Sequence, residues 1–521
     1  MKLAELEAHP GAEGPVVLCI LDGVGLGDGG AGDAVAAART PTLDRLMASH
    51  PWRPIRAHGT AVGLPTDGDM GNSEVGHNAL GAGRVFDQGA KLVDIGIRDG
   101  TAFGETWRWL IGGGTLHLLG LLSDGNVHSH VDHLLALVAR ADADGVERLR
   151  VHVLTDGRDV GERTAPGYIA QLEGALEATG RDYRIASGGG RMHITMDRYE
   201  ADWAMVERGW ACHVDGVGRR FASASEAISA LYDEDPSTTD QWLPAFVIED
   251  SGEPVGRIEA GDGVLLFNFR GDRAIEISQA FEGRGAFPTD PDVRYAGMME
   301  YDGDAKVPRR YLVEPPAIDR TVGEYLAANG RRSFAISETQ KYGHVTFFFN
   351  GNKSGLIDEA LEEYVEIPSD NVPFDQLPEM QARAITERAV AAIGNGWDHV
   401  RLNLANGDMV GHTGDLAATV RAVEVIDDCV RQLEEAVAAA GGVLLVTADH
   451  GNADDMLQKD GVTPRTSHSL NPVPFILVDR RGRWELAPVE GAGLANAGTS
   501  LLVLCGLQPP DDFEPALVRP A

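Results

Sequence analysis

The chain has 521 residues, 43% of them hydrophobic and 24% charged, which indicates a globular protein of two or more domains. No apolar run approaches the roughly 20 residues that span a membrane, and the N-terminal MKLAELEAHPGAEGP lacks the apolar segment of a secretory signal. The formal net charge of −34 argues against a nucleic-acid partner, because so acidic a surface repels a phosphate backbone.

The cysteines indicate a reducing compartment. They lie far apart and form no CxxC pair: Cys19, Cys212, Cys429 and Cys505. This spacing argues against a disulfide framework and against a cysteine zinc site. We therefore expect a cytoplasmic protein in which any catalytic metal is held by carboxylate and imidazole groups.

Short apolar runs alternate with amphipathic stretches along the whole chain, which predicts a parallel α/β architecture. In chain order, the runs expected as strands include PVVLCIL, RLRVHVLT, GVLLFNF, RSFAIS, HVRLNLAN and GGVLLVT. Helices are expected between them, for example over 42–49 and 416–440. Most of these runs lead directly into polar residues. Because ligands gather at the carboxyl ends of strands in open α/β sheets, we expect one site to be built at several strand ends.

The first run ends at Asp22, and a glycine-rich stretch, LPTDGDMGNSEVGHNALGAGR, then carries Ser73. We expect this loop to turn into a helix that begins near Glu74. Backbone N–H groups at such a helix N-terminus could receive a transferring phosphate beside Ser73. A serine in this setting more often caps its helix, so the residue alone leaves both roles open.

Arginines mark the middle of the chain. The run RLRVHVLT leads to DGRD at 156–159, and GVLLFNF leads to Arg270, with Arg273 three positions later. Arginine forks bind phosphate and carboxylate groups in bidentate fashion. The alternative is that these arginines form surface ion pairs, which is the commoner fate of arginines in α/β loops.

Four segments carry side chains suited to divalent metals. They contain Asp22, then Asp408 and His412 in NGDMVGHTGD, then Asp449 and His450 in TADHGNADD, and His468 in RTSHS. Carboxylate and imidazole ligands without thiolate suit manganese or zinc, and magnesium less well. Each residue alone has an ordinary explanation as a turn, a helix cap or a surface histidine. Because three of the segments follow expected strands, we expect a site for two metals, which can activate a serine for phosphoryl transfer.

Taken together, eight segments resemble the signature segments of cofactor-independent phosphoglycerate mutases, a family of the alkaline phosphatase superfamily. They follow the family's order over almost the whole chain: DGVG at 22–25, MGNSEVGHNALGAGR at 70–84, GLLSDGNVHSH at 120–130, DGRD at 156–159, NFRGDRAI at 268–275, SETQKYGHVTFFFNG at 337–351, NGDMVGHTGD at 406–415 and ADHGNAD at 448–454. The resemblance implies an α/β fold in which an alkaline-phosphatase-like three-layer domain (1–87 and 317–521) is interrupted by an inserted α/β transferase domain (88–316).

The same resemblance implies roles for individual residues. One metal, most often manganese in the family, would be surrounded by Asp22, Ser73, Asp449 and His450, and the other held by Asp408, His412 and His468. Ser73 would be the nucleophile that becomes phosphoserine, Asp159 a general acid/base, and Lys341 a group that stabilises charge on the transferred oxygen. Substrate would be bound by His128, Arg158, Asp159, Arg191, Arg198, Arg270 and Arg273 in the inserted domain, and by Lys341.

The implied reaction is the interconversion of 3-phosphoglycerate and 2-phosphoglycerate in glycolysis and gluconeogenesis. It would use two divalent metals and no 2,3-bisphosphoglycerate, in a cytoplasmic monomer with neither a membrane nor a nucleic-acid partner. One rival is another phosphomonoesterase or a phosphopentomutase of the superfamily, against which the arginine segments at 156–159 and 268–273 argue. A second rival is a non-catalytic metal-binding protein, against which the complete set of nucleophile and ligands argues.

One segment departs from the family pattern. The family usually shows a GRYYAMDR-like stretch, in which the second arginine follows the first by six positions. Here the stretch is GRMHITMDR, and Arg198 follows Arg191 by seven. The additional residue leaves open whether both arginines take the positions that the resemblance implies.

Overall fold

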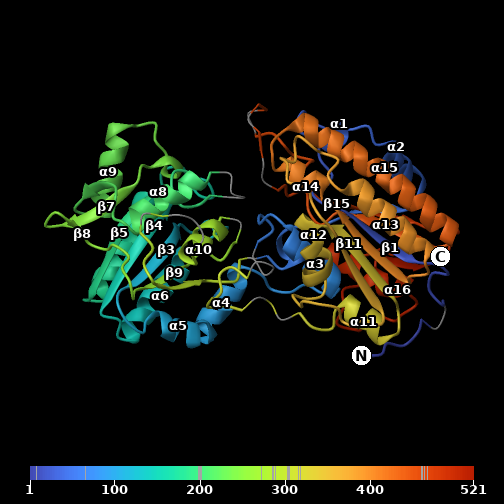
Figure 1. Cartoon of the computed structure of the whole chain (residues 1–521), viewed down its shortest axis with the longest axis horizontal. Helices are drawn as coiled ribbons and strands as arrows, with labels where there is room; N and C mark the ends of the chain where they lie inside the picture. Colours follow the sequence, from blue (N-terminus) through green and yellow to red (C-terminus); the bar gives the residue numbers. More distant parts are fainter. Residues whose placement is uncertain are drawn as a thin grey trace. The chain divides into compact units, whose positions relative to one another are not determined.

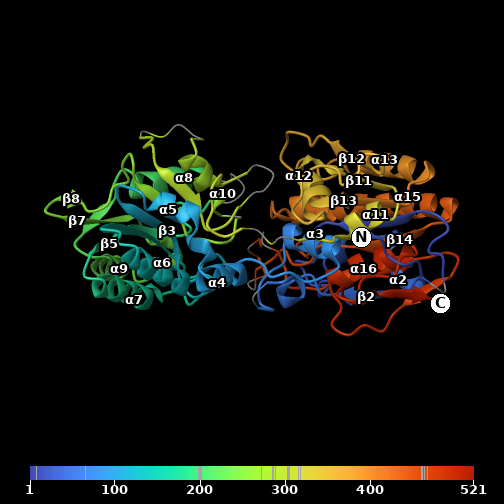
Figure 2. The same ribbon diagram turned by 90° about the horizontal axis from the view of Figure 1, so that it is seen from below.

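In the computed structural model the chain forms two compact units, Met1–Gln88 with Pro316–Ala521 (unit 1) and Gly89–Pro315 (unit 2) (Figures 1 and 2). These limits differ by one residue from the expected domain boundaries. The structure describes all residues except 7–8, 65, 198–201, 272, 284–286, 288, 302–305, 315, 317, 459–460, 463 and 466–467. Within the described part, no helix combines the length and the apolar character needed to cross a membrane.

Unit 1 is built on a seven-stranded sheet in the order β12-β11-β13-β1-β14-β15-β2. The strands are β1 (Val16–Leu21), β2 (Trp52–Ile55), β11 (Ser333–Glu338), β12 (Glu362–Ile367), β13 (His399–Leu404), β14 (Val443–Thr447) and β15 (Val473–Val478). The first five in the order are mutually parallel, whereas β15 is antiparallel to both of its neighbours. A separate two-stranded sheet pairs β16 (Trp484–Leu486) with β17 (Val518–Pro520).

Helices cover both faces of this sheet. They are α1 (Ala34–Ala37), α2 (Pro41–Ser49), α3 (Ser73–Ala82), α11 (Val322–Ala328), α12 (Thr339–Gly343), α13 (Ala382–Gly394), α14 (Asn406–Gly411), α15 (Leu416–Ala440) and α16 (Leu494–Leu504). Helices α13 and α15 pack on each other, and α3 and α11 pack on α16. Helix α15 has the limits that the sequence predicted, and Gly441 in the left-handed conformation ends it.

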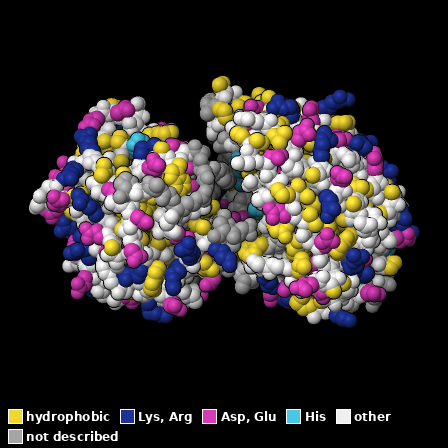
Figure 3. Space-filling view, viewed as in Figure 1, with side chains coloured by type: hydrophobic (Ala, Val, Ile, Leu, Met, Phe, Trp, Pro, Cys, Tyr) yellow, Lys and Arg dark blue, Asp and Glu magenta, His cyan; other side chains and the backbone are white. Residues whose placement is uncertain are grey.

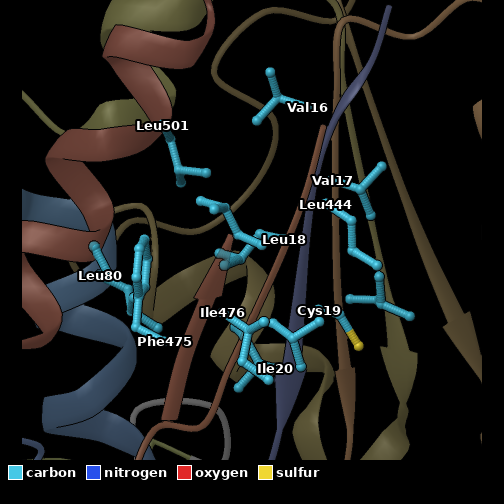
Figure 4. Close-up of a cluster of buried hydrophobic side chains, with 14 of the residues drawn as sticks. Val16, Val17, Leu18, Cys19, Ile20, Leu80, Leu444, Phe475, Ile476 and Leu501 are labelled. Atoms are coloured by element: carbon cyan, nitrogen blue, oxygen red, sulfur yellow. The ribbon is translucent and has the colours of Figure 1, made fainter. Parts of the chain in front are cut away.

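The core of unit 1 lies on both sides of β1, in which all six residues are buried. Figure 4 shows Leu18 and Ile20 on the side of Leu80 from α3 and Leu501 from α16, while Cys19 points to the other side. A strand that is apolar at every position is typical of a parallel sheet covered on both faces. The expected α/β fold with parallel sheets is therefore confirmed.

Unit 2 has its own sheet, in the order β10-β9-β3-β4-β5-β7-β6, with β8 paired to β7. The strands are β3 (Leu116–Leu122), β4 (Arg148–Thr155), β5 (Asp182–Gly190), β6 (Arg219–Phe221), β7 (Phe246–Asp250), β8 (Glu253–Pro254), β9 (Gly263–Leu266) and β10 (Arg294–Gly297). The first five strands in the order are parallel, and β7 is antiparallel to β5.

Two separate apolar clusters hold helices against this sheet. The helices are α4 (Ala90–Arg98), α5 (Glu105–Leu110), α6 (Val131–Ala143), α7 (Ala165–Ala178), α8 (Trp203–His213), α9 (Ala224–Glu234) and α10 (Ile275–Phe281). One cluster contains residues of α6, α7 and α9, and the other contains residues of α8 and α10. Acidic and basic side chains are interspersed on the face shown in Figure 3, so on that face the negative charge is distributed.

Candidate active site and metal ligands

The candidate site of unit 1 lies at the carboxyl ends of three neighbouring strands. Asp22 follows β1, Asp408 lies in α14 directly after β13, and Asp449 follows β14. Because β1 pairs in parallel with both β13 and β14, the three strand ends meet at one edge of the sheet. All three carboxylates are buried, with at most 3% of their surface exposed. Three acidic groups at one buried place repel one another and favour a bound cation.

Ser73 is the first residue of α3, but it is not the cap of this helix. Asn72 is the N-cap, and its side chain accepts a hydrogen bond from the Val75 N–H at 3.0 Å. The helix therefore begins one residue before the expected Glu74, and the Ser73 hydroxyl takes no part in capping. Its Oγ lies 2.9 Å from Nε2 of His450 and 3.3 Å from Oδ1 of Asp22.

Lys341 lies in α12, after the end of β11, and it is buried. Its Nζ donates to Ser73 Oγ at 2.5 Å, to Asp408 Oδ2 at 2.8 Å and to Asp22 Oδ1 at 3.0 Å. Burial disfavours the ammonium, but the carboxylates of Asp22 and Asp408 outweigh this effect and raise the pKa of Lys341. Lys341 is therefore a fixed positive charge beside the candidate nucleophile.

Two groups of described residues could each hold a metal ion. The ligand atoms of Asp22, Asp408 and His450 lie within 4.8 Å of one another, and so do those of Asp408, His412 and His468. Nε2 of His468 lies 3.2 Å from Oδ1 of Asp408, and Nε2 of His412 lies 3.0 Å from the same oxygen. Asp408 belongs to both groups, so its carboxylate is a candidate ligand in each.

Asp449 lies beside the first group without belonging to it. Its Oδ2 is 3.8 Å from Nε2 of His450, and this buried oxygen accepts no hydrogen bond. Burial and the charge of Asp449 raise the pKa of Asp22, because two buried carboxylates oppose each other's ionisation. An unsatisfied buried oxygen and a destabilised carboxylate both fit a divalent metal, which would satisfy the first and stabilise the charge of the second.

Several residues that sequence reasoning missed hold these groups in place. Asn403 Nδ2 donates to Asp22 Oδ2 at 2.6 Å, and Asn452 Nδ2 donates to Asp408 Oδ1 at 2.9 Å. Nδ1 of His77 lies 2.8 Å from the Ser73 carbonyl oxygen and 3.4 Å from Asp449 Oδ2. Asn403 carried a detectable signal, since it is the one amide in the apolar run HVRLNL.

Gly23 allows this close arrangement. Its backbone has φ of +73°, and a Cβ atom there would lie 2.6 Å from the Asp408 backbone N and Cα. A side chain would therefore meet backbone and would also be strained. The glycine after Asp22 is what lets the loop after β1 lie against α14.

Unit 2 brings several of the expected substrate residues together around Arg191. This arginine is buried, and its Nη1 donates to Asp156 Oδ1 at 2.7 Å and also to Asp159 Oδ2. Nε2 of His128 lies 4.0 Å from Asp159 Oδ2. Burial opposes the charges here, but Arg191 outweighs it and lowers the pKa of Asp156. Asp156 is a further residue for which sequence reasoning gave no role.

The remaining arginines come from two nearby segments of unit 2. The Phe269 N–H donates to the His128 carbonyl at 2.8 Å, which places the segment with Arg270 beside His128. Arg273 Nη1 donates to the Met196 carbonyl at 2.8 Å, in the loop that follows Arg191. Arg158 is exposed, next to Asp159. Arg198 lies outside the described residues.

Comparisons with known proteins agree with this site. Residues 14–509 match the family model described as the metalloenzyme superfamily. A protein of Leptospira interrogans named "probable 2,3-bisphosphoglycerate-independent phosphoglycerate mutase" is 53% identical, with 97% of each chain covered. The 2,3-bisphosphoglycerate-independent phosphoglycerate mutase of Trypanosoma brucei brucei is 51% identical, again with 97% of each chain covered.

Among solved structures, the phosphoglycerate mutase of Leishmania mexicana, crystallised at low cobalt concentration, matches with a TM-score of 0.77 and 48% identity over 100% of both chains. High identity over nearly the full length and a shared fold thus accompany the buried carboxylates, histidines and serine of unit 1. The chain belongs to the family of 2,3-bisphosphoglycerate-independent phosphoglycerate mutases, within the metalloenzyme superfamily.

Proposed function

We propose that this chain interconverts 3-phosphoglycerate and 2-phosphoglycerate, in glycolysis and gluconeogenesis, through a phosphoserine formed at Ser73. One observation carries the proposal most directly. Because Asn72 caps α3, the Ser73 hydroxyl takes no part in capping. It contacts Lys341, His450 and Asp22 within a cluster of candidate metal ligands. The full-length similarity to mutases named for this activity supports the same reaction.

The ligand residues suit two divalent metals, and we assign manganese because both groups combine carboxylate with imidazole and lack thiolate. The first metal would be held by Asp22, Ser73, Asp449 and His450, with Asp408 beside them as a further candidate ligand, and the second by Asp408, His412 and His468. Two bound metals supply positive charge that favours the alkoxide form of Ser73 and neutralises the transferring phosphoryl group.

Three side chains of the protein take part in the phosphoryl transfer: Ser73, Lys341 and Asp159. Ser73 Oγ forms a bond to phosphorus while the bond from phosphorus to the substrate oxygen breaks, which leaves glycerate and phosphoserine. Lys341 donates a hydrogen bond to Ser73 Oγ and stabilises the alkoxide that attacks phosphorus in the first half and leaves it in the second. In the second half of the reaction the other glycerate hydroxyl attacks the phosphoserine. Asp159 gives a proton to the glycerate oxygen that leaves phosphorus in the first half, and it removes a proton from the attacking glycerate hydroxyl in the second half.

Unit 2 retains glycerate between the two halves of the reaction. The substrate carries a carboxylate and hydroxyl groups, which match arginine forks and a histidine. The residues that we assign to this binding are His128, Arg158, Asp159, Arg191, Arg198, Arg270 and Arg273. Water must be kept from the phosphoserine during this interval, since hydrolysis would turn the mutase into a phosphatase.

We further propose that the protein acts as a cytoplasmic monomer on a small-molecule substrate, without 2,3-bisphosphoglycerate and without a membrane or nucleic-acid partner. The net charge of −34 supports the absence of a polyanionic partner. The four cysteines are all buried and unpaired, which suits a reducing compartment.

The test is a mutase assay with purified protein, manganese and 3-phosphoglycerate, in the absence of 2,3-bisphosphoglycerate. We expect 2-phosphoglycerate without release of inorganic phosphate, and we expect EDTA and Ser73→Ala each to abolish it. Release of phosphate without 2-phosphoglycerate would instead identify a phosphomonoesterase. Unchanged activity in Ser73→Ala would contradict the phosphoserine route.

A further inference from the structure

A chain of hydrogen bonds between buried side chains runs across the sheet of unit 2. Nε2 of His117 lies 3.1 Å from Asp262 Oδ2, and Nδ1 of His117 lies 2.9 Å from Nε2 of His152. Nδ1 of His152 lies 2.7 Å from Ser187 Oγ. None of these four residues exposes more than 6% of its surface. The residues come from three adjacent strands, β3, β4 and β5, and from the turn before β9.

This series of hydrogen bonds continues beyond the sheet into a loop. Ser187 Oγ lies 2.7 Å from Nδ1 of His213, the last residue of α8, and Nε2 of His213 lies 3.0 Å from Thr195 Oγ1. Thr195 belongs to loop 191–197, which follows β5. We call the set of six side chains the histidine chain: Asp262, His117, His152, Ser187, His213 and Thr195.

A single arrangement of protons satisfies the whole histidine chain. Asp262 accepts N–H groups of Thr115 and Glu259 as well, so as a carboxylate it must accept from His117 Nε2. His117 Nδ1 then accepts from His152 Nε2, and His152 Nδ1 accepts from the Ser187 hydroxyl. That hydroxyl accepts from His213 Nδ1, which leaves His213 Nε2 to accept from Thr195. Every histidine is neutral, and every proton points toward Asp262.

The surroundings favour this neutral arrangement. Burial lowers the pKa of His117 and His152, and it lowers the pKa of His213 to about 3. All three rings therefore stay neutral at pH 7. Because each ring has one donor and one acceptor nitrogen, loss of any member leaves its neighbours without a partner in the core.

Thr195 is the member that needs this support. It is buried and β-branched, yet its backbone has φ of +71°, a left-handed conformation that such residues rarely adopt. A Cβ on Gly209 of α8 would lie 2.1 Å from Thr195 Oγ1, so the absent side chain of Gly209 leaves the space for the hydroxyl. The Thr195 N–H also donates to the Met205 carbonyl of α8 at 2.9 Å. Thr195 thereby fixes loop 191–197 to α8.

The loop held in this way carries groups of the candidate substrate site. Arg191, at its start, pairs with Asp156 and Asp159, and the carbonyl of Met196, next to Thr195, accepts from Arg273. A shift of Thr195 would displace that carbonyl and change the position of the Arg273 guanidinium. Loop 191–197 also lies in the segment that is one residue longer than the family pattern.

We propose that the histidine chain positions loop 191–197, and that Thr195 and His213 are positioning residues for the substrate-binding arginines Arg191 and Arg273. The inference rests on the proposed function, because it takes these arginines to bind phosphoglycerate. The histidine chain itself does not reach the substrate and transfers no proton. Its role is to hold a strained backbone in one conformation by a sequence of bonds anchored at Asp262.

The test compares Thr195→Val, which keeps the shape and loses the hydroxyl, with Thr195→Ser, which keeps the hydroxyl. In mutase assays with manganese we expect Thr195→Val to raise KM for 3-phosphoglycerate by about tenfold with a smaller change in kcat, and Thr195→Ser to stay near the wild type. Tyr183→Phe is the matched control. It removes a buried hydroxyl from the same strand as Ser187, where that hydroxyl donates to the Val146 carbonyl at 2.8 Å, and it should leave KM unchanged.

A second measurement does not depend on activity. NMR spectra of the protein labelled with ¹⁵N-histidine report the tautomer of each ring at pH 7. The histidine chain requires the Nε2–H tautomer for His117 and His152 and the Nδ1–H tautomer for His213. Thr195→Val should shift the His213 ring signals, whereas Tyr183→Phe should not. An active wild type whose KM is unchanged by Thr195→Val, or a charged or Nε2–H His213, would overturn this inference alone. A wild type without mutase activity would overturn the proposed function instead.

Discussion

The ammonium of Lys341 lies 2.8 Å from Oδ2 of Asp408, and the two groups form a buried ion pair in unit 1. The same ammonium reaches Ser73 Oγ and Asp22 Oδ1. Lys341 therefore connects the proposed nucleophile to two carboxylates that we assign to metals. Its charge offsets part of the repulsion in that cluster, so it has a role in folding as well as in the reaction.

Replacing Lys341 with methionine should affect both folding and the reaction. Removal of the charge leaves Asp22 and Asp408 without their buried partner, so we expect a loss of about 3–5 kcal/mol in the unfolding free energy of the metal-free protein. We also expect kcat of the manganese-loaded enzyme to fall about 10²–10³-fold. Urea denaturation and the mutase assay measure the two effects.

Lys353→Met is the control for Lys341→Met. Lys353 pairs with Glu324 at 2.7 Å, but 44% of its side chain is exposed. An exposed pair contributes about 0–1 kcal/mol, so this variant should change stability by no more than that. Equal effects of the two substitutions would show that the Lys341 pairs have no special weight.

Ser73→Ala should remove activity while leaving the helix intact. Because Asn72 caps α3, loss of the Ser73 hydroxyl should change the unfolding free energy by less than about 1 kcal/mol, while kcat falls by at least about 10⁴-fold. Asn72→Ala should do the reverse. It should cost about 1 kcal/mol of stability and retain far more activity than Ser73→Ala. A destabilised Ser73→Ala protein would mean that the serine supports α3 after all.

Metal stoichiometry should depend on which ligand is replaced, because Asp408 belongs to both candidate groups and His468 to one. We expect about two manganese ions per wild-type chain, about one in His468→Gln, and fewer than one in Asp408→Asn. Elemental analysis after dialysis gives the count, and calorimetric titration gives the affinity of each site. Two retained ions in Asp408→Asn would contradict the shared ligand.

The stability of unit 2 should decrease in mild acid through its buried histidines. Burial lowers the pKa of His213 to about 3, so the folded protein keeps this ring neutral while the unfolded chain protonates it near pH 6.5. His213 therefore causes no loss of stability above pH 6.5, and it lowers the unfolding free energy as the pH falls from 6.5 toward 3. Between pH 7 and pH 5 this loss of unfolding free energy amounts to about 2 kcal/mol for one histidine.

His213→Asn removes this titrating group and keeps a donor for Ser187. Its unfolding free energy should be lower than that of the wild type at pH 7, but the further loss on going to pH 5 should be smaller by about 2 kcal/mol. Urea denaturation at the two pH values measures the difference. Parallel losses in both proteins would mean that His213 is already charged in the folded state.

Much of the architecture could be predicted from the sequence because buried strands appear in it as uninterrupted apolar runs. The uninterrupted apolar run before Asp22 is a central strand, and the polar residues after it lie at the site. The parallel α/β fold and the limits of α15 followed from the same kind of pattern. Strand-end placement was enough to bring Asp22, Asp408 and Asp449 together.

The sequence was less informative wherever one position decides the outcome. Ser73 and Asn72 are both good caps, and only the backbone conformation shows that Asn72 takes this role. The histidine chain depends on how strands align, and β4 and β5 change register between Val151 and His152. No pattern of residue types specifies such a shift. His152 and Ser187, which face each other just after this shift, could not be paired in advance for that reason.

The order of the strands in unit 1 has a consequence for synthesis on the ribosome. β1 is synthesised before unit 2, but its partners β13 and β14 are made only after all of unit 2. Unit 2 is continuous in the chain and can complete its own core in the meantime. The six apolar residues of β1 must wait unpaired through that interval. Slower translation beyond residue 315 should therefore lengthen the exposure of this apolar strand rather than help unit 1 to fold, and holding chaperones should bind the nascent chain at β1.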